Sequence, residues 1–168
     1  SVANINAPGQ IVIAGTKAGV DRAIEIAKTR GVRRALLLPV SAPFHCELMA
    51  PAMEKLAPEL EAARFSALRV PVVSNVDAQP YADAATARLR LREQVCAPVR
   101  WVESVRWLHD EIGVRRFVEV GPGSVLSGLV KRIVPGAATA SLAEPAALSA
   151  LETSAIPETT LAGAGVKV

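Results

Sequence analysis

The stretch Arg116-Phe117-Val118-Glu119-Val120-Gly121-Pro122-Gly123-Ser124 decides the fold class of this chain. Five residues of strand type lead into a Gly-Pro-Gly turn, and Ser124 then opens a pattern with apolar residues at helical spacing. A short strand is expected to follow over residues 139–142. Strands that alternate with helices in this way predict a parallel sheet covered by helices, which is the α/β class.

The residues before this stretch predict further elements of both kinds. Residues 1–6 and 11–15 flank a Pro-Gly turn and indicate a β-hairpin. A helix over residues 18–30 can be capped by Thr16 and stopped by Gly31. The remaining expected elements are a strand at 35–38, a helix at 47–63 that Pro58 kinks or ends early, a strand at 70–76, and helices at 82–95 and 99–111.

Composition excludes several classes of protein. The chain has 168 residues, a net charge of +3 and 51% hydrophobic residues, which suits one globular domain or one domain with a small appended unit. It lacks the Lys/Arg runs of a nucleic-acid surface and the long apolar run of a membrane span. Two cysteines, Cys46 and Cys96, make neither a disulfide framework nor a metal site. A soluble cytoplasmic protein without nucleic-acid, membrane or metal partners is expected.

His45 is the best candidate for a catalytic base. It follows an apolar run that ends in two prolines and it precedes a helical pattern, so a rigid scaffold would hold it. The pKa of histidine lies near neutrality, which suits proton transfer, although a structural histidine is the commoner case. His109 is expected to be solvated or to cap its helix. Cys46 is not expected to pair with His45, because successive side chains of an extended segment point to opposite faces.

A histidine base needs an acceptor on its second ring nitrogen. No Asp or Glu is marked for this role, and Gln94 at a helix end could turn inward, although glutamine there is normally solvated. The chain contains no Gly-x-Ser-x-Gly elbow. If His45 serves acyl transfer, its nucleophile must therefore lie outside these residues.

Two other features could bind phosphate. The turn at residues 121–124 could present backbone N–H groups, but it lacks the further glycines and the lysine of a nucleotide motif, so a structural role is favoured. Three basic pairs could contact phosphate or an acidic protein, or could be ordinary solvated surface. They are Arg33-Arg34, Arg115-Arg116 and Lys131-Arg132.

Five ordered segments together resemble the C-terminal half of the malonyl-CoA:acyl-carrier-protein transacylase family. They are residues 4–15, residues 39–46 with 48–49, residues 70–77, Gln94 with residues 98–101, and residues 119–126. The resemblance implies a partial α/β-hydrolase-like core with a parallel sheet, formed by residues 41–151. It also implies that residues 1–40 are the later part of a ferredoxin-like small subdomain. Residues 152–168 are expected to be a flexible tail.

The resemblance also implies a Ser/His ping-pong reaction that needs no cofactor, in which malonyl-CoA and phosphopantetheinylated acyl carrier protein are the substrates. His45 falls on the family's base, and Gln94 on the position whose carbonyl oxygen orients that base. Arg33 and Arg34 fall where the family contacts phosphate. Asn4, Asn6 and Gln10 fall on a hairpin that lines the substrate cleft, and Phe44 on the bulky residue that goes with malonyl selection.

The serine elbow, the oxyanion loop and the arginine that clamps the malonyl carboxylate are expected in an N-terminal half outside these residues. The chain by itself is therefore predicted to be an inactive fragment that needs this other half as a partner. Two alternatives remain open, a non-catalytic fragment that docks carrier protein and a thioester hydrolase of the α/β-hydrolase type.

Overall fold

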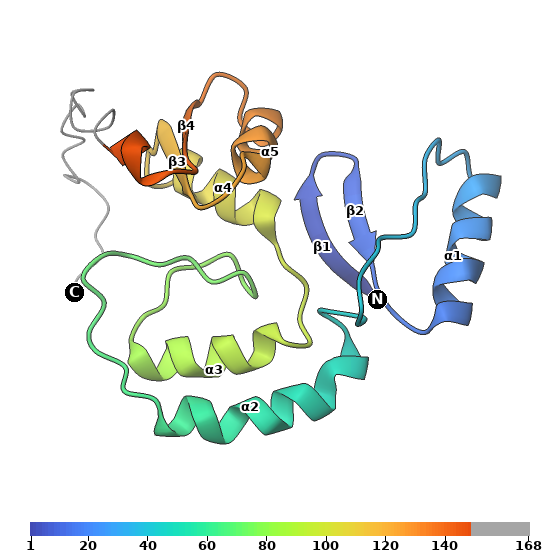
Figure 1. The fold of residues 1–168 in the computed structure, drawn as a ribbon, viewed down its shortest axis with the longest axis horizontal. Coiled ribbons are helices and arrows are strands. Elements are labelled where there is room, and N and C mark those ends of the chain that lie inside the picture. The colour runs from blue at the N-terminus through green and yellow to red at the C-terminus, as the bar shows by residue number, and fades with distance from the viewer. Residues whose placement is uncertain (149–168) are drawn as a thin grey trace. The chain divides into compact units, whose positions relative to one another are not determined.

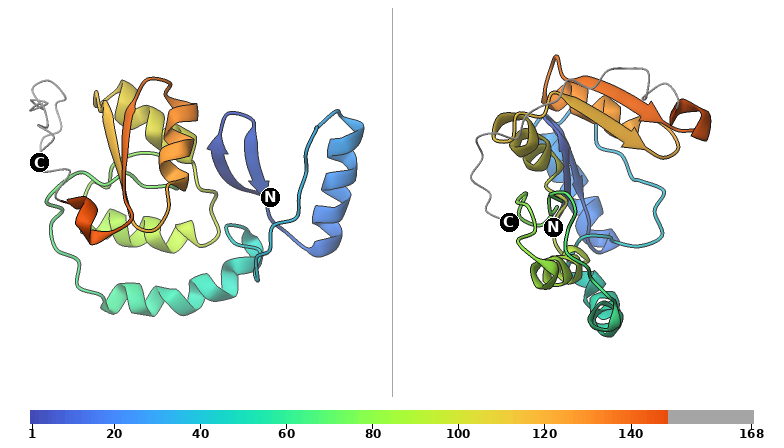
Figure 2. Two further views of the ribbon diagram at one scale, coloured as in Figure 1. Left: turned by 45° about the horizontal axis from the view of Figure 1, so that its top comes forward. Right: turned by 90° about the vertical axis from the view of Figure 1, so that its left-hand side faces the viewer.

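The computed structural model describes residues 1–148. The chain forms two compact units, Ser1–Trp101 and the residues from Val102 onward (Figures 1 and 2). The boundary predicted between residues 40 and 41 falls inside the first unit and stays a prediction. The tail predicted for residues 152–168 lies outside the described residues.

The first unit opens with the predicted hairpin. Strands β1 (Val2–Ala7) and β2 (Gln10–Ile13) pair antiparallel, and Gly9 turns the chain between them with a φ of 73°. Helix α1 (Lys17–Thr29) follows, with the Thr16 hydroxyl accepting a hydrogen bond from the Gly19 N–H at 3.2 Å. The hairpin and this capped helix confirm the prediction.

Two further helices of the first unit lie in contact. A 3-10 turn, η1 (Glu47–Met49), leads into α2 (Ala50–Ala62), which contacts α3 (Ala84–Gln94) (Figure 1). Pro58 was predicted to kink this helix or to end it early; it lies inside α2, so the early end is wrong and the kink stays a prediction. Arg88 of α3 gives the physical reason, because its guanidinium donates to the carbonyl oxygens of Leu60 at 2.7 Å and Ala63 at 3.3 Å and so holds the last turn.

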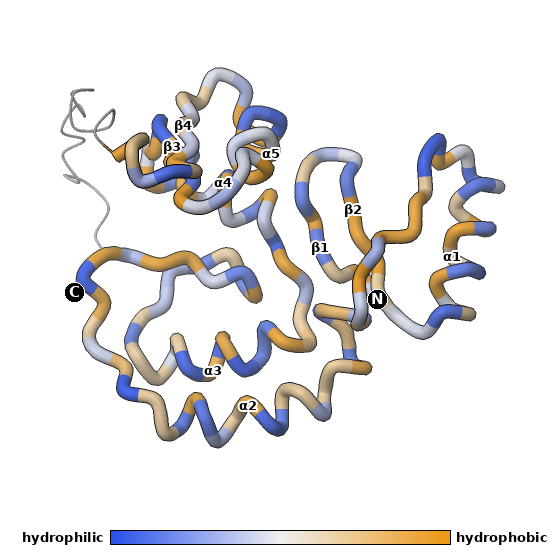
Figure 3. The backbone as a smooth tube through the Cα atoms, in the orientation of Figure 1, coloured by the Kyte–Doolittle hydropathy of each residue, from blue (hydrophilic) through white to orange (hydrophobic). Residues whose placement is uncertain are grey.

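Two predicted strands are wrong. Residues 35–38 form no strand, and Leu36, Leu37 and Leu38 are 62%, 65% and 53% exposed. Figure 3 shows this hydrophobic segment between α1 and α2. Residues 70–76 form only an isolated bridge between Val73 and Pro80. A strand is stable only beside a partner strand. Among the described residues, 35–38 have none, and 70–76 have only the short stretch 79–81.

The second unit contains the predicted parallel sheet. Its elements are α4 (Trp101–Asp110), β3 (Arg116–Val120), α5 (Val125–Ile133), β4 (Ala138–Leu142) and the 3-10 turn η2 (Pro145–Ala147). Strands β3 and β4 pair in parallel, and α5 connects them and contacts both. Val105 is 1% exposed, and Val130 and Ile133 are also buried. The α/β class is therefore confirmed.

No helix within residues 1–148 is both long enough and apolar enough to cross a bilayer.

Candidate active site

The backbone at His45 has an unusual conformation. His45 lies between Pro43 and η1, and its φ of 60° places it in the left-handed region. For a residue with a Cβ this conformation costs on the order of 1–2 kcal/mol. Residues held this way occur often at functional sites, where the surrounding structure enforces a side-chain direction.

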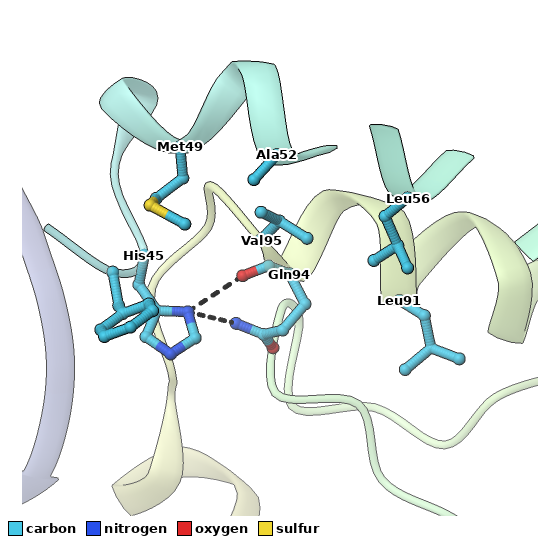
Figure 4. A pocket seen from close by; sticks show the side chains of 8 residues that line it. His45, Met49, Ala52, Leu56, Leu91, Gln94 and Val95 are labelled. Carbon is cyan, nitrogen blue, oxygen red and sulfur yellow. Dashed lines mark hydrogen bonds between the residues drawn. The ribbon is translucent and has the colours of Figure 1, made fainter. Parts of the chain in front are cut away.

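A hydrogen bond fixes the imidazole of His45. Its Nδ1 lies 3.0 Å from the backbone carbonyl oxygen of Gln94 (Figure 4). A carbonyl oxygen can only accept, so the proton sits on Nδ1 and the neutral ring keeps its lone pair on Nε2. His45 Nε2 is therefore the atom that can take a proton from a nucleophile.

The Gln94 side chain serves a different contact. Its amide nitrogen donates to the Ala97 carbonyl oxygen at 2.9 Å and lies 3.4 Å from His45 Nδ1. Because both of these nitrogens carry protons in the Nδ1–H form, the longer contact adds no hydrogen bond. The structure thus brings the two predicted residues together through the main chain of Gln94.

An apolar pocket of about 350 Å³ adjoins His45. Met49, Ala52 and Leu56 from η1 and α2 face Leu91 and Val95 across it (Figure 4). Phe44, 47% exposed, also lines the pocket. The polar side chains of the lining are His45 and Gln94. Sequence reasoning missed Leu91 and Val95, although their spacing of four residues places them on one face of the predicted helix.

The two cysteines near this site have different surroundings. Cys46 is buried, and its thiol donates to the Pro43 carbonyl oxygen at 3.1 Å. Burial raises the pKa of Cys96, and the neighbouring Cys46 and Glu47 raise it further. The Cys46 thiol thus contacts the Pro43 carbonyl oxygen, in agreement with the expectation that it does not pair with His45.

The other predicted residues of the first unit lie on two segments. Asn4 and Asn6 are half-buried on β1, alternating with the buried Ala3 and Ala7, and Gln10 begins β2 and is exposed. Asn4 also forms a bridge with Val99, five residues beyond Gln94. Arg33 and Arg34 are exposed and do not line the pocket beside His45.

The other histidine, His109, has a neighbour of its own. Its Nδ1 lies 2.7 Å from the Asp110 carboxylate, and Arg115 donates to its carbonyl oxygen at 2.7 Å. The His109 side chain is 23% exposed, so the expected solvated or capping role stays a prediction.

The turn at residues 121–124 holds no free anion site. Glu119 accepts hydrogen bonds from the N–H groups of Leu126 at 3.0 Å and Ser127 at 2.7 Å, at the first turn of α5. These bonds lower the pKa of Glu119. The Glu119 carboxylate therefore occupies these two donors at the helix start, which agrees with the structural role predicted for this turn.

Comparison with known proteins identifies the relatives of this chain. No family model matches it. A malonyl CoA-acyl carrier protein transacylase of Salmonella typhimurium is 53% identical over 150 residues, which are 89% of this chain and 48% of that protein. The transacylase of Bacillus subtilis is 49% identical over 144 residues, which are 86% of this chain and 45% of that protein.

Solved structures agree with the sequence relatives. The acyl-carrier-protein S-malonyltransferase of Burkholderia pseudomallei matches with a TM-score of 0.85 and 47% identity, over 90% of this chain and 49% of that one. A malonyl-transacylase in complex with a type II polyketide synthase acyl-carrier protein matches with a TM-score of 0.84 and 45% identity, over 90% and 49%. The chain spans about half the length of the relatives it matches. Over that length it is homologous to the C-terminal half of the malonyl CoA-acyl carrier protein transacylases.

Proposed function

We propose that this chain supplies the histidine half of a malonyl transferase, which moves a malonyl group from CoA to the phosphopantetheine thiol of acyl carrier protein in fatty-acid synthesis. The observation that carries the proposal is the hydrogen bond from His45 Nδ1 to the Gln94 carbonyl oxygen at 3.0 Å, which leaves Nε2 as a base. The proposed setting is the cytoplasm, and the chemistry requires no cofactor.

In the first half-reaction, His45 Nε2 takes the proton of a serine hydroxyl as the serine oxygen attacks the malonyl thioester. The imidazolium then returns this proton to the departing CoA sulfur, and a malonyl-serine ester forms. In the second half-reaction the carrier-protein thiol gives its proton to Nε2 and attacks the ester, and the serine oxygen recovers the proton. The Gln94 carbonyl stabilises the imidazolium in both steps, because its hydrogen bond persists when the ring is charged.

The remaining predicted residues take supporting roles in this proposal. Phe44, beside the pocket, limits the size of the acyl group, and Asn4, Asn6 and Gln10 line the substrate cleft. Arg33 and Arg34 contact phosphate of CoA or carrier protein, which their exposure permits. The proposed architecture is a partial α/β-hydrolase-like core with the later part of a ferredoxin-like subdomain.

The serine comes from a second polypeptide segment that corresponds to the other half of the relatives. Two observations support this partner. The 168 residues contain no Gly-x-Ser-x-Gly elbow. The apolar run of residues 36–40 also exposes large aliphatic side chains, including Val40 at 60%, in a segment that pairs with no strand among residues 1–148. A strand of the partner beside this run would satisfy its backbone and cover its side chains.

The test co-expresses the chain with the N-terminal half of the Salmonella typhimurium relative and measures malonyl transfer to carrier protein by mass spectrometry. The expected result is transfer by the pair and none by either half. In the pair, His45→Ala should lower the rate by several orders of magnitude, whereas His109→Ala, the matched control, should retain it. Transfer by the isolated chain, or full activity of the His45→Ala pair, would overturn the proposal.

The same assay separates the alternatives. A thioester hydrolase would release free malonate without loading carrier protein. A docking fragment is favoured by the exposed pair Arg33 and Arg34. It would bind carrier protein without the other half, with an affinity that falls as salt rises.

A further inference from the structure

The way α3 ends leaves the Gln94 carbonyl oxygen without a helical hydrogen bond, so it can accept one from His45. In a continuing α-helix this oxygen would accept the N–H of residue 98. The N–H groups before it do not reach Gln94: those of Cys96 and Ala97 donate to Glu93, at 3.1 and 3.0 Å, and that of Val95 donates to Arg92 at 3.3 Å. Residue 98 is Pro98, which has no N–H.

The next two donors in the chain are also committed. The Val99 N–H donates to the Ala3 carbonyl oxygen of β1 at 2.8 Å, and the Arg100 N–H donates to the Asn75 carbonyl oxygen at 3.0 Å. Backbone N–H groups of residues 95–100 therefore leave the Gln94 oxygen unclaimed, and His45 Nδ1 takes it at 3.0 Å.

The proline ring has a second effect on this segment. It disfavours helical backbone at the residue before it, so Ala97 leaves the helix. The Gln94 amide fastens the Ala97 carbonyl oxygen at 2.9 Å, and the bridge from Val99 to Asn4 holds the chain beyond. With proline at position 98 the segment is thus bent away from α3, and its backbone donors do not reach the Gln94 carbonyl oxygen.

We propose that Pro98 is a positioning residue, which reserves the Gln94 carbonyl for His45 and thereby sets the imidazole tautomer that has its lone pair on Nε2. The use of that lone pair in catalysis rests on the proposed function, whereas the tautomer itself does not. Replacing Pro98 with alanine restores an N–H and lets α3 extend by one residue, so a backbone donor competes with His45 for the same oxygen.

The experiment reads the tautomer directly in the purified chain. In ¹⁵N-labelled protein above the titration range of histidine, the two ring nitrogens have distinct shifts according to which carries the proton. The chain has two histidines, so His109 is an internal reference. Wild-type His45 should be in the Nδ1–H form, and Pro98→Ala should lower the ratio of Nδ1–H to Nε2–H several-fold.

Two variants serve as controls. Pro58→Ala also restores a helical N–H, but inside α2 and opposite the Glu54 carbonyl, so the His45 tautomer should not change. Gln94→Ala keeps both the main-chain carbonyl and Pro98, so it should also retain the Nδ1–H form.

Three results would overturn the proposal. They are an Nε2–H form in the wild type, an unchanged tautomer in a Pro98→Ala protein whose amide spectrum remains folded, and a switched tautomer in Gln94→Ala. The first and third decide the matter even where Pro98→Ala does not fold. None requires malonyl transfer, so a failed reconstitution would count against the proposed function alone.

Discussion

The three exposed leucines of the apolar run give a quantitative test of the proposed partner. Full burial of a leucine side chain stabilises by about 1.5–3 kcal/mol. Leu36, Leu37 and Leu38 are 62%, 65% and 53% exposed, so covering each would contribute about 1–2 kcal/mol. Replacing all three with serine should therefore weaken binding of the other half by about 3 kcal/mol or more, which is a Kd raised about 100-fold.

The assay titrates the purified chain with the N-terminal half of the Salmonella typhimurium relative and follows heat release. The triple serine variant should keep the circular dichroism and melting temperature of the wild type, because these side chains are largely outside the described core. Leu89→Ser provides the control, since Leu89 is 51% exposed but lies on α3, away from the run.

The reasoning fails if the triple variant binds the other half as tightly as the wild type. It also fails if Leu89→Ser weakens binding as much, because non-specific hydrophobic association would then explain the affinity. A wild-type chain that sediments as a stable dimer through this run and ignores the other half would identify a second copy as the occupant instead.

Two predictions concern the second unit. Val105→Ala should lower the free energy of unfolding by about 2 kcal/mol, since the side chain is 1% exposed, whereas Val125→Ala, at 73% exposed, should stay within about 0.5 kcal/mol in the same urea titration. Glu119→Gln should lower the melting temperature at neutral pH, because the folded-state pKa of Glu119 is lowered and its charged form stabilises the fold. That stabilisation is present above the unfolded pKa of about 4.3 and is lost as pH falls through the folded value, so the two proteins should converge in acid. A difference that grows toward acid would contradict the role given to Glu119.

The sequence was sufficient to predict those elements whose hydrogen-bond and packing partners lie close to them along the chain. The strand, turn and helix from residue 116 to residue 133 were predictable, because the crossover helix and the paired strand follow within the same stretch. The hairpin and the Thr16 cap were predictable for the same reason. His45 was predictable because it follows two prolines and precedes a helical pattern, and because the segments on both sides occur in the order of the resembled family.

Tertiary structure decided what depends on distant residues. Residues 35–38 have strand composition, but strands need a partner for their N–H and C=O groups, and the described residues supply none. The sequence predicted that Gln94 orients His45, but not that its backbone carbonyl oxygen makes the hydrogen bond. That choice depends on where β1 and Asn75 hold the chain beyond Pro98, and therefore on which backbone donors are already engaged.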